Sequence, residues 1–252
     1  MVRVDLNSDL GETVDGSPTA DDAAMFRLIS SANIACGFHA GDADSMLVSC
    51  RLAVENGVSV GAHVSYRDRA HFGRADLEVL PAVLTDEVIE QLTALAEAAR
   101  NAGTRIRYVK PHGALYNKIV SDDRRADAVA RAIAEFSPGL PLMGLAGSAA
   151  ERAASRFSLP FVREAFVDRA YQHNGTLVPR KLPGAVLHGA SEVAERAVAM
   201  VTDGTVRALD GRLVHVEVDS LCVHGDTPDS VEMATAVRLA LAAAGVEVGA
   251  FA

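Results

Sequence analysis

The sequence predicts an α/β barrel formed by a single domain, residues 1–252. Apolar, β-branched runs alternate with helical patterns from one end of the chain to the other, as repeated β-α units require. The length of 252 residues is usual for such a barrel, which takes about 250 residues. No linker rich in Gly, Ser or Pro divides the chain. A doubly wound open sheet has the same alternation, and we prefer the barrel.

Each predicted strand is a short apolar run with turn residues around it. Such runs give seven or eight β-α units, and the strands lie near residues 2–8, 31–36, 58–64, 105–111, 140–145, 161–166 and 213–223.

Helices are predicted where apolar residues recur at helical spacing. Met46, Cys50 and Val54 form one such stripe, which predicts a buried helix face. Three further stripes consist of Met233, Val237 and Leu241; of Val88, Leu92, Leu95 and Ala99; and of Val129, Ile133 and Phe136. Residues 168–186 show neither periodicity and are rich in Gly, Pro and basic residues, so we expect a long functional loop or lid there.

Composition narrows the class of ligand. A net charge of −9, without a cluster of Lys and Arg interleaved with aromatics, argues against nucleic-acid binding. No window approaches the ~20 apolar residues of a membrane span, and the first residues lack a signal peptide, so a cytoplasmic location is expected. The three cysteines form no CxxC pair, which argues against a disulfide framework and a thiolate zinc site. A small substrate or a protein partner remains.

Side chains that act as acids, bases or metal ligands follow nearly every predicted strand. In α/β barrels and open α/β sheets, the carboxyl ends of the strands meet at one edge, where loops assemble the active site. Histidine suits such a site because its unperturbed pKa lies near ~6.5. The candidate catalytic residues at this edge are Asp9, Glu12, His39, His63, Lys110, His112, Glu164, His224 and Asp226.

Each of these signals has a structural alternative. Turns and helix starts also favour Gly and Asp, so Asp42 and Asp229 are equally explained as helix N-caps. His188 and His215 have no neighbouring polar constellation and are interpreted as structural, whereas His71 and His173 stay undecided. For Lys110, at the end of an apolar strand, we expect either a pKa lowered by burial or a role in holding an anionic group.

The same residues fit a divalent metal site or metal-free proton transfer. Because no HExxH or similar compact pair of ligands is present, spacing does not decide between the two, and we favour the metal-free site. The candidate metal ligands are Asp9, His39, His63 and His112. No GxxxxGK[ST] loop and no GxGxxG follows a strand, so any use of ATP must come through a partner or an unusual site.

Six motifs give the sequence a specific resemblance. Together they resemble the LamB/YcsF lactam-utilisation family, in the right order and over about the whole chain. The resemblance implies a seven-stranded β/α barrel, TIM-like and related to the glycoside hydrolase and polysaccharide deacetylase barrels. The motifs are DLNSDLGE at 5–12, SANIACGFHAGD at 31–42, GAHVSYRDRAHFGR at 61–74, VKPHGALYN at 109–117, EAFVDRAYQHNGTLVPR at 164–180 and LCVHGDTP at 221–228.

The resemblance also implies an activity. It is the ATP-dependent opening of the 5-oxoproline (pyroglutamate) lactam to L-glutamate, performed together with 5-oxoprolinase subunits B and C. Within the matched motifs, the candidate substrate-binding residues are Asn7, Asn33, Asp42, Tyr66, Arg74, Tyr116, Asn117 and Arg169.

The absence of a phosphate loop then has a chemical explanation. A lactam amide is a poor electrophile, and phosphorylation of its oxygen gives a reactive, imidate-like species for water to attack. We expect subunits B and C to assist this activation with ATP. The barrel edge then binds or hydrolyses the ring, with a carboxylate or histidine activating water and Lys110 or an arginine holding the substrate carboxylate.

The chain departs from the family pattern mainly in its third motif. These changes predict a loosened or reshaped loop over residues 65–75, because proline and glycine restrict or permit backbone conformations that other residues do not. Val64 and Arg67 replace prolines, His71 replaces a glycine, Ala75 replaces an arginine, and Asn174 stands where an acidic residue is usual.

Two other functions compete with lactam opening. One is a metal-dependent hydrolase or deacetylase of a carbohydrate or N-acyl substrate, because related barrels place His and Asp around a metal. The other is a non-catalytic subunit that presents a ligand to its partners, since binding sites also gather polar groups.

Overall fold

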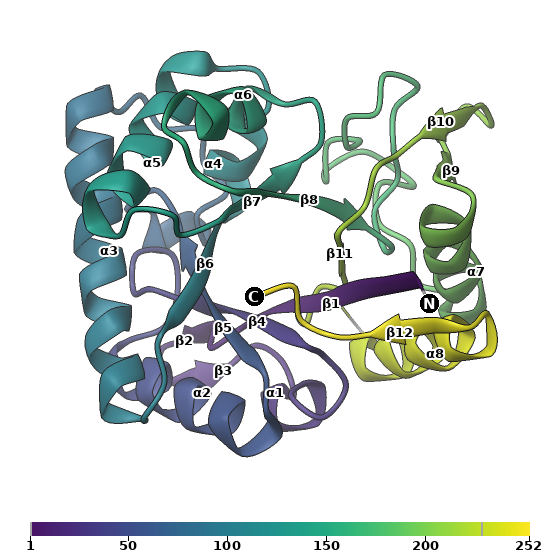
Figure 1. Ribbon diagram of the computed structural model, residues 1–252, viewed down its shortest axis with the longest axis horizontal. Helices are drawn as coiled ribbons and strands as arrows, with labels where there is room; N and C mark the ends of the chain where they lie inside the picture. The colour runs from purple at the N-terminus through teal and green to yellow at the C-terminus, as the bar shows by residue number, and fades with distance from the viewer. Residues whose placement is uncertain (1, 228) are drawn as a thin grey trace.

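The structure is a closed barrel of parallel strands surrounded by helices (Figure 1). It is a computed structural model that describes residues 2–227 and 229–252. The strand order β1-β4-β5-β6-β7-β8-β11 returns to β1, because β11 pairs with β1 as well as with β8. This closure confirms the predicted barrel of seven strands and excludes the open sheet. Among the described residues, no helix combines the length and apolarity needed to cross a membrane.

The seven barrel strands agree closely with the predicted runs. They are β1 (Val2–Leu10), β4 (Ser31–Ala35), β5 (Ser59–Val64), β6 (Ile106–Pro111), β7 (Leu142–Leu145), β8 (Phe161–Phe166) and β11 (Ser220–Cys222). Outside the barrel, β12 (Val246–Val248) pairs with the first residues of β1. Two short hairpins are β2 (Thr13–Val14) with β3 (Ser17–Pro18), and β9 (Thr205–Arg207) with β10 (Leu213–His215).

The helices lie around the outside of this strand ring (Figure 1). Those of the described residues are α1 (Asp22–Met25), α2 (Ala43–Asn56), α3 (Pro81–Asn101), α4 (Gly113–Lys118), α5 (Asp123–Phe136), α6 (Ala149–Arg156), α7 (Ala190–Thr202) and α8 (Ser230–Ala243), with a 3-10 turn η1 (Arg69–His71). The prediction that Val54 belongs to the buried stripe of α2 is wrong, since Val54 is 49% exposed. With 3.6 residues per turn, Ala53 returns closer to the face of Met46 and is buried instead.

The predicted strand 213–223 is wrong in its first half. The run divides into β10, which pairs antiparallel with β9, and β11, which belongs to the barrel. Between them, Asp219 accepts hydrogen bonds from the backbone and guanidinium of Arg163, and Glu217 pairs with the same guanidinium. These charged contacts end the apolar run before the barrel strand begins.

Polar side chains fill part of the barrel interior and support the catalytic edge. Alternate residues of a strand face the same side, so Asp5, Asn7 and Asp9 of β1 point inward in successive layers and are all buried. The amide of Asn33 donates to Asn7 Oδ1 at 2.7 Å and to Asp9 Oδ1 at 2.8 Å. Tyr108 Oη donates to Asn33 Oδ1 at 2.6 Å. These contacts fix the carboxylate of Asp9 from below.

Gly61 makes room for the ring of Tyr108. A Cβ atom added at Gly61 would lie 2.2 Å from Tyr108 Cζ, which is far inside van der Waals contact. The absence of a side chain at Gly61, the register partner of Tyr108, therefore lets the ring cross over β5 and its hydroxyl reach Asn33 in the polar interior.

Residues 168–186 form the expected long segment without helix or extended strand. Its regular pairing consists of two isolated antiparallel bridges, Arg169↔Val186 and Tyr171↔Leu177. Arg169 donates from its guanidinium to the carbonyls of Ala185 and Val178, which holds the two sides of the loop. Its movement as a lid stays a prediction.

Candidate functional site

A cavity of about 750 Å³ lies at the carboxyl ends of the barrel strands. Most of the predicted site residues line it. They are Asp9, Glu12, His63, Lys110, His112, His224 and Asp226 from the catalytic set, and Arg74, Tyr116, Asn117 and Arg169 from the substrate-binding set. The long loop 168–186 contributes Thr176, Leu177, Pro179, Arg180 and Lys181 to the wall. The expected edge therefore holds a concave site of the kind that binds small molecules.

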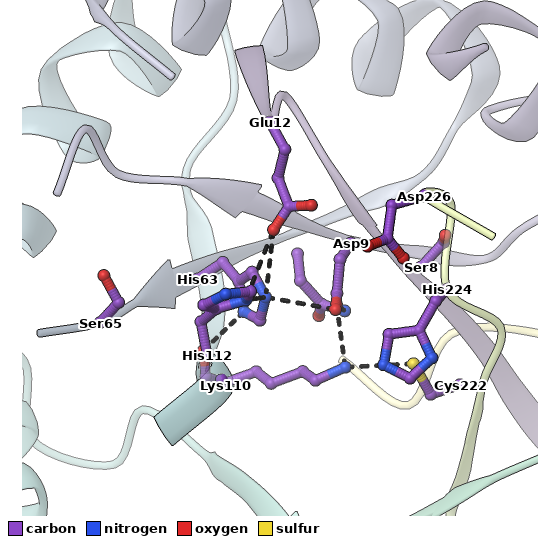
Figure 2. A network of polar contacts seen from close by, with 12 residues as sticks. Ser8, Asp9, Glu12, His63, Ser65, Lys110, His112, Cys222, His224 and Asp226 are labelled. Carbon is purple, nitrogen blue, oxygen red and sulfur yellow. Dashed lines mark hydrogen bonds and ion pairs between the residues drawn. The ribbon is translucent and has the colours of Figure 1, made fainter. Parts of the chain in front are cut away.

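Lys110 lines this cavity, and its ammonium group points toward Asp9 and Cys222 (Figure 2). Its Nζ lies 2.9 Å from Asp9 Oδ1 and 2.7 Å from Glu164 Oε1, and it also contacts Cys222 Sγ at 3.2 Å. Burial alone would lower the pKa of Lys110, but Asp9, Cys222 and Glu164 raise it well above its usual value. The expectation of a lowered pKa is therefore wrong, and Lys110 serves as a permanent buried cation.

Asp9 is the charged partner of this lysine. Burial raises the pKa of Asp9, yet His63 and Lys110 outweigh that effect and hold the pKa well below its usual range. Asp9 Oδ2 lies 3.3 Å from His63 Nε2, so the same carboxylate joins the lysine to a neighbouring group of histidines.

The histidine cluster consists of His39, His63 and His112, which gather around the carboxylate of Glu12. Figure 2 shows His63 and His112 beside that carboxylate. Glu12 Oε1 lies 3.0 Å from His39 Nε2 and 3.4 Å from His112 Nδ1. The rings of His39 and His112 stack with centroids 3.9 Å apart. Burial lowers the pKa of His39 and of His112 well below the usual value, and burial raises the pKa of Glu12.

The loop after β5 presses against this cluster. His112 Nε2 donates to the carbonyl of Phe72 at 3.0 Å. Gly73 has a left-handed φ of +66°, and a Cβ atom there would lie 2.8 Å from both His112 Cδ2 and His39 Cβ. Glycine is thus required at this position both for backbone conformation and for close packing on the imidazoles.

His224 forms a separate pair with Asp168. Its Nδ1 donates to Asp168 Oδ2 at 2.9 Å, and its backbone N–H donates to the same oxygen at 3.1 Å. Burial lowers the pKa of His224, but the charge of Asp168 outweighs it and the pKa is raised. Because Asp168 engages Nδ1, the other ring nitrogen of this cavity-lining histidine is left for proton transfer.

Asp226 holds two arginines at the mouth of the cavity. Arg74 Nη2 donates to Asp226 Oδ2 at 2.6 Å, and Arg180 Nη2 donates to Asp226 Oδ1 at 3.1 Å. Burial raises the pKa of Asp226, whereas Arg180, His224 and Arg74 together bring it below the usual value. A carboxylate held in this way is suited to orienting the arginines rather than to exchanging protons.

Six predicted residues do not line the cavity. His39 lies behind Glu12 in the histidine cluster, and Glu164 lies beneath Lys110. Asn7 and Asn33 belong to the interior layer that supports Asp9. We therefore do not assign these four residues a direct contact with substrate. Asn7 and Asn33 lie one layer deeper in the barrel than the cavity-lining Asp9.

Asp42 and Tyr66 lie outside the cavity lining and have structural roles. Asp42 is the exposed N-cap of α2, where its side chain accepts from Ser45 N in a capping box, as its structural alternative predicted. Tyr66 is fully buried in the hydrophobic core. Asp229 also occupies an N-cap position, at the start of α8, but its side chain makes no capping hydrogen bond.

The sequence of the chain matches a known protein family. The model of the LamB/YcsF family matches residues 4–252. The chain belongs to the LamB/YcsF family. A relative from Kocuria rhizophila, named as the A subunit of 5-oxoprolinase, is 54% identical over 252 residues, which is 100% of both chains.

Solved structures agree with this LamB/YcsF assignment. The lactam utilization protein from Thermus thermophilus has a TM-score of 0.94 and 44% sequence identity, and the match covers 99% of this chain and 100% of that one. A T48 deacetylase has a TM-score of 0.51 at 13% identity, over 98% of this chain and 87% of the deacetylase. That second likeness shows the barrel fold alone.

The altered third LamB/YcsF motif is held by its own contacts. Asp68 accepts from His71 N and from Ala75 N, which closes the turn around η1. Arg67 stacks over the ring of Phe38 at 3.7 Å and pairs with Glu90 on α3. The two replacements Arg67 and His71 thus make surface contacts, while Gly73 and Arg74 keep their places at the site.

Several site residues were not among the predicted set. Arg180 lies in the aperiodic loop, and Cys222 is the last residue of β11, where its thiol lies against Lys110. Asp168 follows β8, and the sequence marks it only as one more polar residue beyond a strand. Its pairing with His224 joins residues 56 positions apart, which no local pattern reveals. Pro228, the final residue of the LamB/YcsF motif 221–228, lies outside the described residues.

The pair of Asp168 and His224 predicts a pH-dependent stability. The pKa of His224 is raised in the folded state. Its contribution to the free energy of unfolding is therefore full below about pH 6.5 and is lost as pH rises through the folded pKa. The folded pKa of Asp168 is lowered, so its contribution is lost only in stronger acid. Urea unfolding should therefore show Asp168→Asn most destabilising at roughly pH 5 to 6 and progressively less so at higher pH.

Asp219→Asn is the matched control for this measurement. Its partner Arg163 does not titrate in that range, so its effect on unfolding should stay flat with pH. An equally flat profile for Asp168→Asn would contradict the assigned pair.

Proposed function

We propose that this chain is the A subunit of a 5-oxoprolinase and opens the 5-oxoproline lactam to L-glutamate, together with ATP and partner subunits B and C. The naming of relatives at about half identity over the whole chain supports this function. The observation that carries it is the cavity itself, in which a cationic mouth, an acid–base histidine and a carboxylate–imidazole cluster face the same space.

The mouth is suited to the carboxylate of the substrate. Each of Arg74 and Arg180 uses part of its guanidinium on Asp226, and a guanidinium has five N–H donors. The remaining donors can bind a carboxylate in the bidentate geometry that arginine favours. Lys110 is not assigned this role, because Asp9 and Glu164 already neutralise it.

The interior is suited to ring opening. Water adds to the activated lactam carbon, the bond from that carbon to the ring nitrogen breaks, and the nitrogen takes up a proton. His224, held by Asp168, donates this proton. Glu12 lines the same cavity beside His63 and His112, and it receives the proton of the attacking water on the carboxylate oxygen that these histidines do not contact.

ATP enters through activation of the amide. The proposed partners transfer the γ-phosphoryl group of ATP to the amide oxygen, which releases ADP and makes the carbon electrophilic. After the carbon–nitrogen bond breaks, the phosphoryl group remains on the new carboxyl group as an acyl phosphate, and a second water hydrolyses it to L-glutamate and phosphate. The cavity of about 750 Å³ is larger than a single five-membered ring requires, so it also accommodates the activated form. Three free, buried cysteines fit the reducing conditions of the cytoplasm, where we place the complex.

An omission assay tests this function. The purified chain, subunits B and C, ATP and 5-oxoproline are combined with one component left out at a time, and L-glutamate is measured. Glutamate should form at full rate only in the complete mixture. Full turnover by the chain alone would overturn the division of labour, and full turnover without the chain would overturn the function.

A further inference from the structure

Four potential metal ligands converge at one point beside the cavity. The atoms are Glu12 Oε1, His39 Nε2, His63 Nε2 and His112 Nδ1, and all lie within 4.8 Å of one another. Each comes from the end of a different strand: Glu12, His39 and His112 follow β1, β4 and β6, and His63 is the last residue but one of β5. Three of the four residues, Glu12, His63 and His112, line the cavity. Such convergence of buried groups needs a compensating interaction.

Hydrogen bonds on the far side of the rings fix two tautomers. His63 Nδ1 lies 3.0 Å from the carbonyl of Lys110, and His112 Nε2 lies 3.0 Å from the carbonyl of Phe72. A carbonyl only accepts, so both of these nitrogens carry their protons. In the neutral rings, His63 Nε2 and His112 Nδ1 therefore present lone pairs to each other across 2.9 Å.

The third tautomer is fixed by Ser65. The hydroxyl of Ser65 donates to the carbonyl of Tyr66 at 2.8 Å, so its oxygen accepts from His39 Nδ1 at 3.0 Å. His39 Nε2 then presents a lone pair to Glu12 Oε1 at 3.0 Å. Gln91 clamps the backbone of Ser65 through both ends of its amide, which holds this arrangement in place.

Three lone pairs and a carboxylate oxygen thus face one another without a donor between them. Protons could fill these contacts, but two are needed, one between Glu12 and His39 and one between His63 and His112. His39 and His112 are both buried, so a positively charged imidazole there would lack solvation. A single divalent cation satisfies all four atoms at once.

We propose that Glu12, His39, His63 and His112 bind one divalent transition-metal ion, with zinc as the best match. Imidazole and carboxylate ligands without thiolate suit this class of metal. Tetrahedral ligands about 2.0–2.1 Å from zinc lie roughly 3.4 Å apart. Four of the six distances among these atoms run from 2.9 to 3.9 Å, and all six are within 4.8 Å. The outer contacts to carbonyls and to Ser65 are those that orient metal-bound histidines.

The ligand set differs from the one expected from sequence. Asp9 was a candidate ligand, but its Oδ1 bonds Lys110 and Asn33, and Glu12 takes its place at the point of convergence. A second group, Asp9, Cys222 and His224, also lies close together. Lys110 Nζ already supplies the positive charge there, so this group is not assigned a metal.

Metal binding to the isolated chain tests the proposal. The chain is stripped with a chelator and titrated with Zn²⁺ or Co²⁺, and elemental analysis, the visible absorption of bound Co²⁺ and the unfolding temperature are measured. We expect one ion per chain, a Co²⁺ spectrum of four-coordinate type and a higher unfolding temperature. Absence of a stoichiometric ion in the wild-type chain would overturn the proposal.

Variants locate the ion. His112→Gln should lose stoichiometric binding, and Ser65→Ala, which removes only the support of His39, should weaken binding about 10–100-fold. His215→Gln changes an exposed histidine on β10 and should bind as the wild type does. Equal affinity of His112→Gln and wild type would contradict the site, and circular dichroism checks that each variant is folded.

This inference is independent of the proposed function, because no substrate enters the measurement. A chain that binds one ion but supports no glutamate formation keeps the metal site and removes the function. A chain that supports glutamate formation and binds no ion keeps the proposed function and removes the metal site.

Discussion

Replacing Lys110 with methionine should lower the free energy of unfolding by about 3–5 kcal/mol, the cost of breaking a buried ion pair by removing one partner. The lysine side chain is only 2% exposed, and its ammonium group lies between Asp9 and Glu164. Methionine fills a similar volume but leaves both carboxylates buried without a cation. Guanidinium unfolding followed by circular dichroism gives the change.

Lys118→Met is the control for this substitution. Lys118 pairs with Asp76 at the surface, where the lysine side chain is 30% exposed. Loss of such a pair costs about 1 kcal/mol or less. A double variant, Lys110→Met with Glu164→Gln, should recover part of the loss because one fewer carboxylate is left unpaired. If Lys110→Met were no more destabilising than Lys118→Met, the buried cation would not support the site.

His224→Gln should lower kcat of the complete complex by about 10²–10⁴-fold, the usual contribution of a general acid. Binding of 5-oxoproline should be retained, because the arginines at the mouth are unchanged. In the wild type, kcat should fall as pH rises through the raised pKa of His224, since the histidine must be protonated to donate. Steady-state assays across pH measure both effects.

His215→Gln is the matched control, because His215 is exposed on β10 away from the cavity. It should leave kcat and its pH profile unchanged. The assignment of the acid would be wrong if His224→Gln kept the wild-type kcat, or if the alkaline fall persisted unaltered in that variant.

The barrel was predictable because its strands are buried on both faces and read as apolar runs. Six of the seven runs agree with barrel strands to within two residues. The exception, 213–223, misled because Val214, Val216 and Val218 look like a strand, whereas Glu217 and Asp219 are fixed by Arg163. The run divides between β10 and β11 where its acidic residues pair with the distant Arg163, and no local sequence pattern reveals that pairing.

Part of the site was predictable from the topology of the barrel. Parallel strands end at one edge, so polar residues after them gather even when far apart in sequence. The sequence did not predict how deep in the barrel each inward side chain lies. Asn7 and Asp9 both face inward, yet only Asp9 reaches the cavity. The metal ligands depended on side-chain length in the same way, since Glu12 reaches the histidines that Asp9 was expected to meet.

Loop residues were the least predictable. Arg180 comes from an aperiodic segment, and only folding brings it to Asp226 beside Arg74. Asp168 gained its role from a histidine on another strand end. Such contacts depend on how loops cross the barrel mouth, which periodicity does not encode.

We propose that the lactam is opened in the cavity at the strand ends. A crystal structure of the chain with 5-oxoproline or L-glutamate tests this most directly. Ligand density is expected in this cavity, with the carboxylate at Arg74 and Arg180 and the reacting amide between His224 and Glu12. Density at another place on the chain, with this cavity free of ligand, would contradict it.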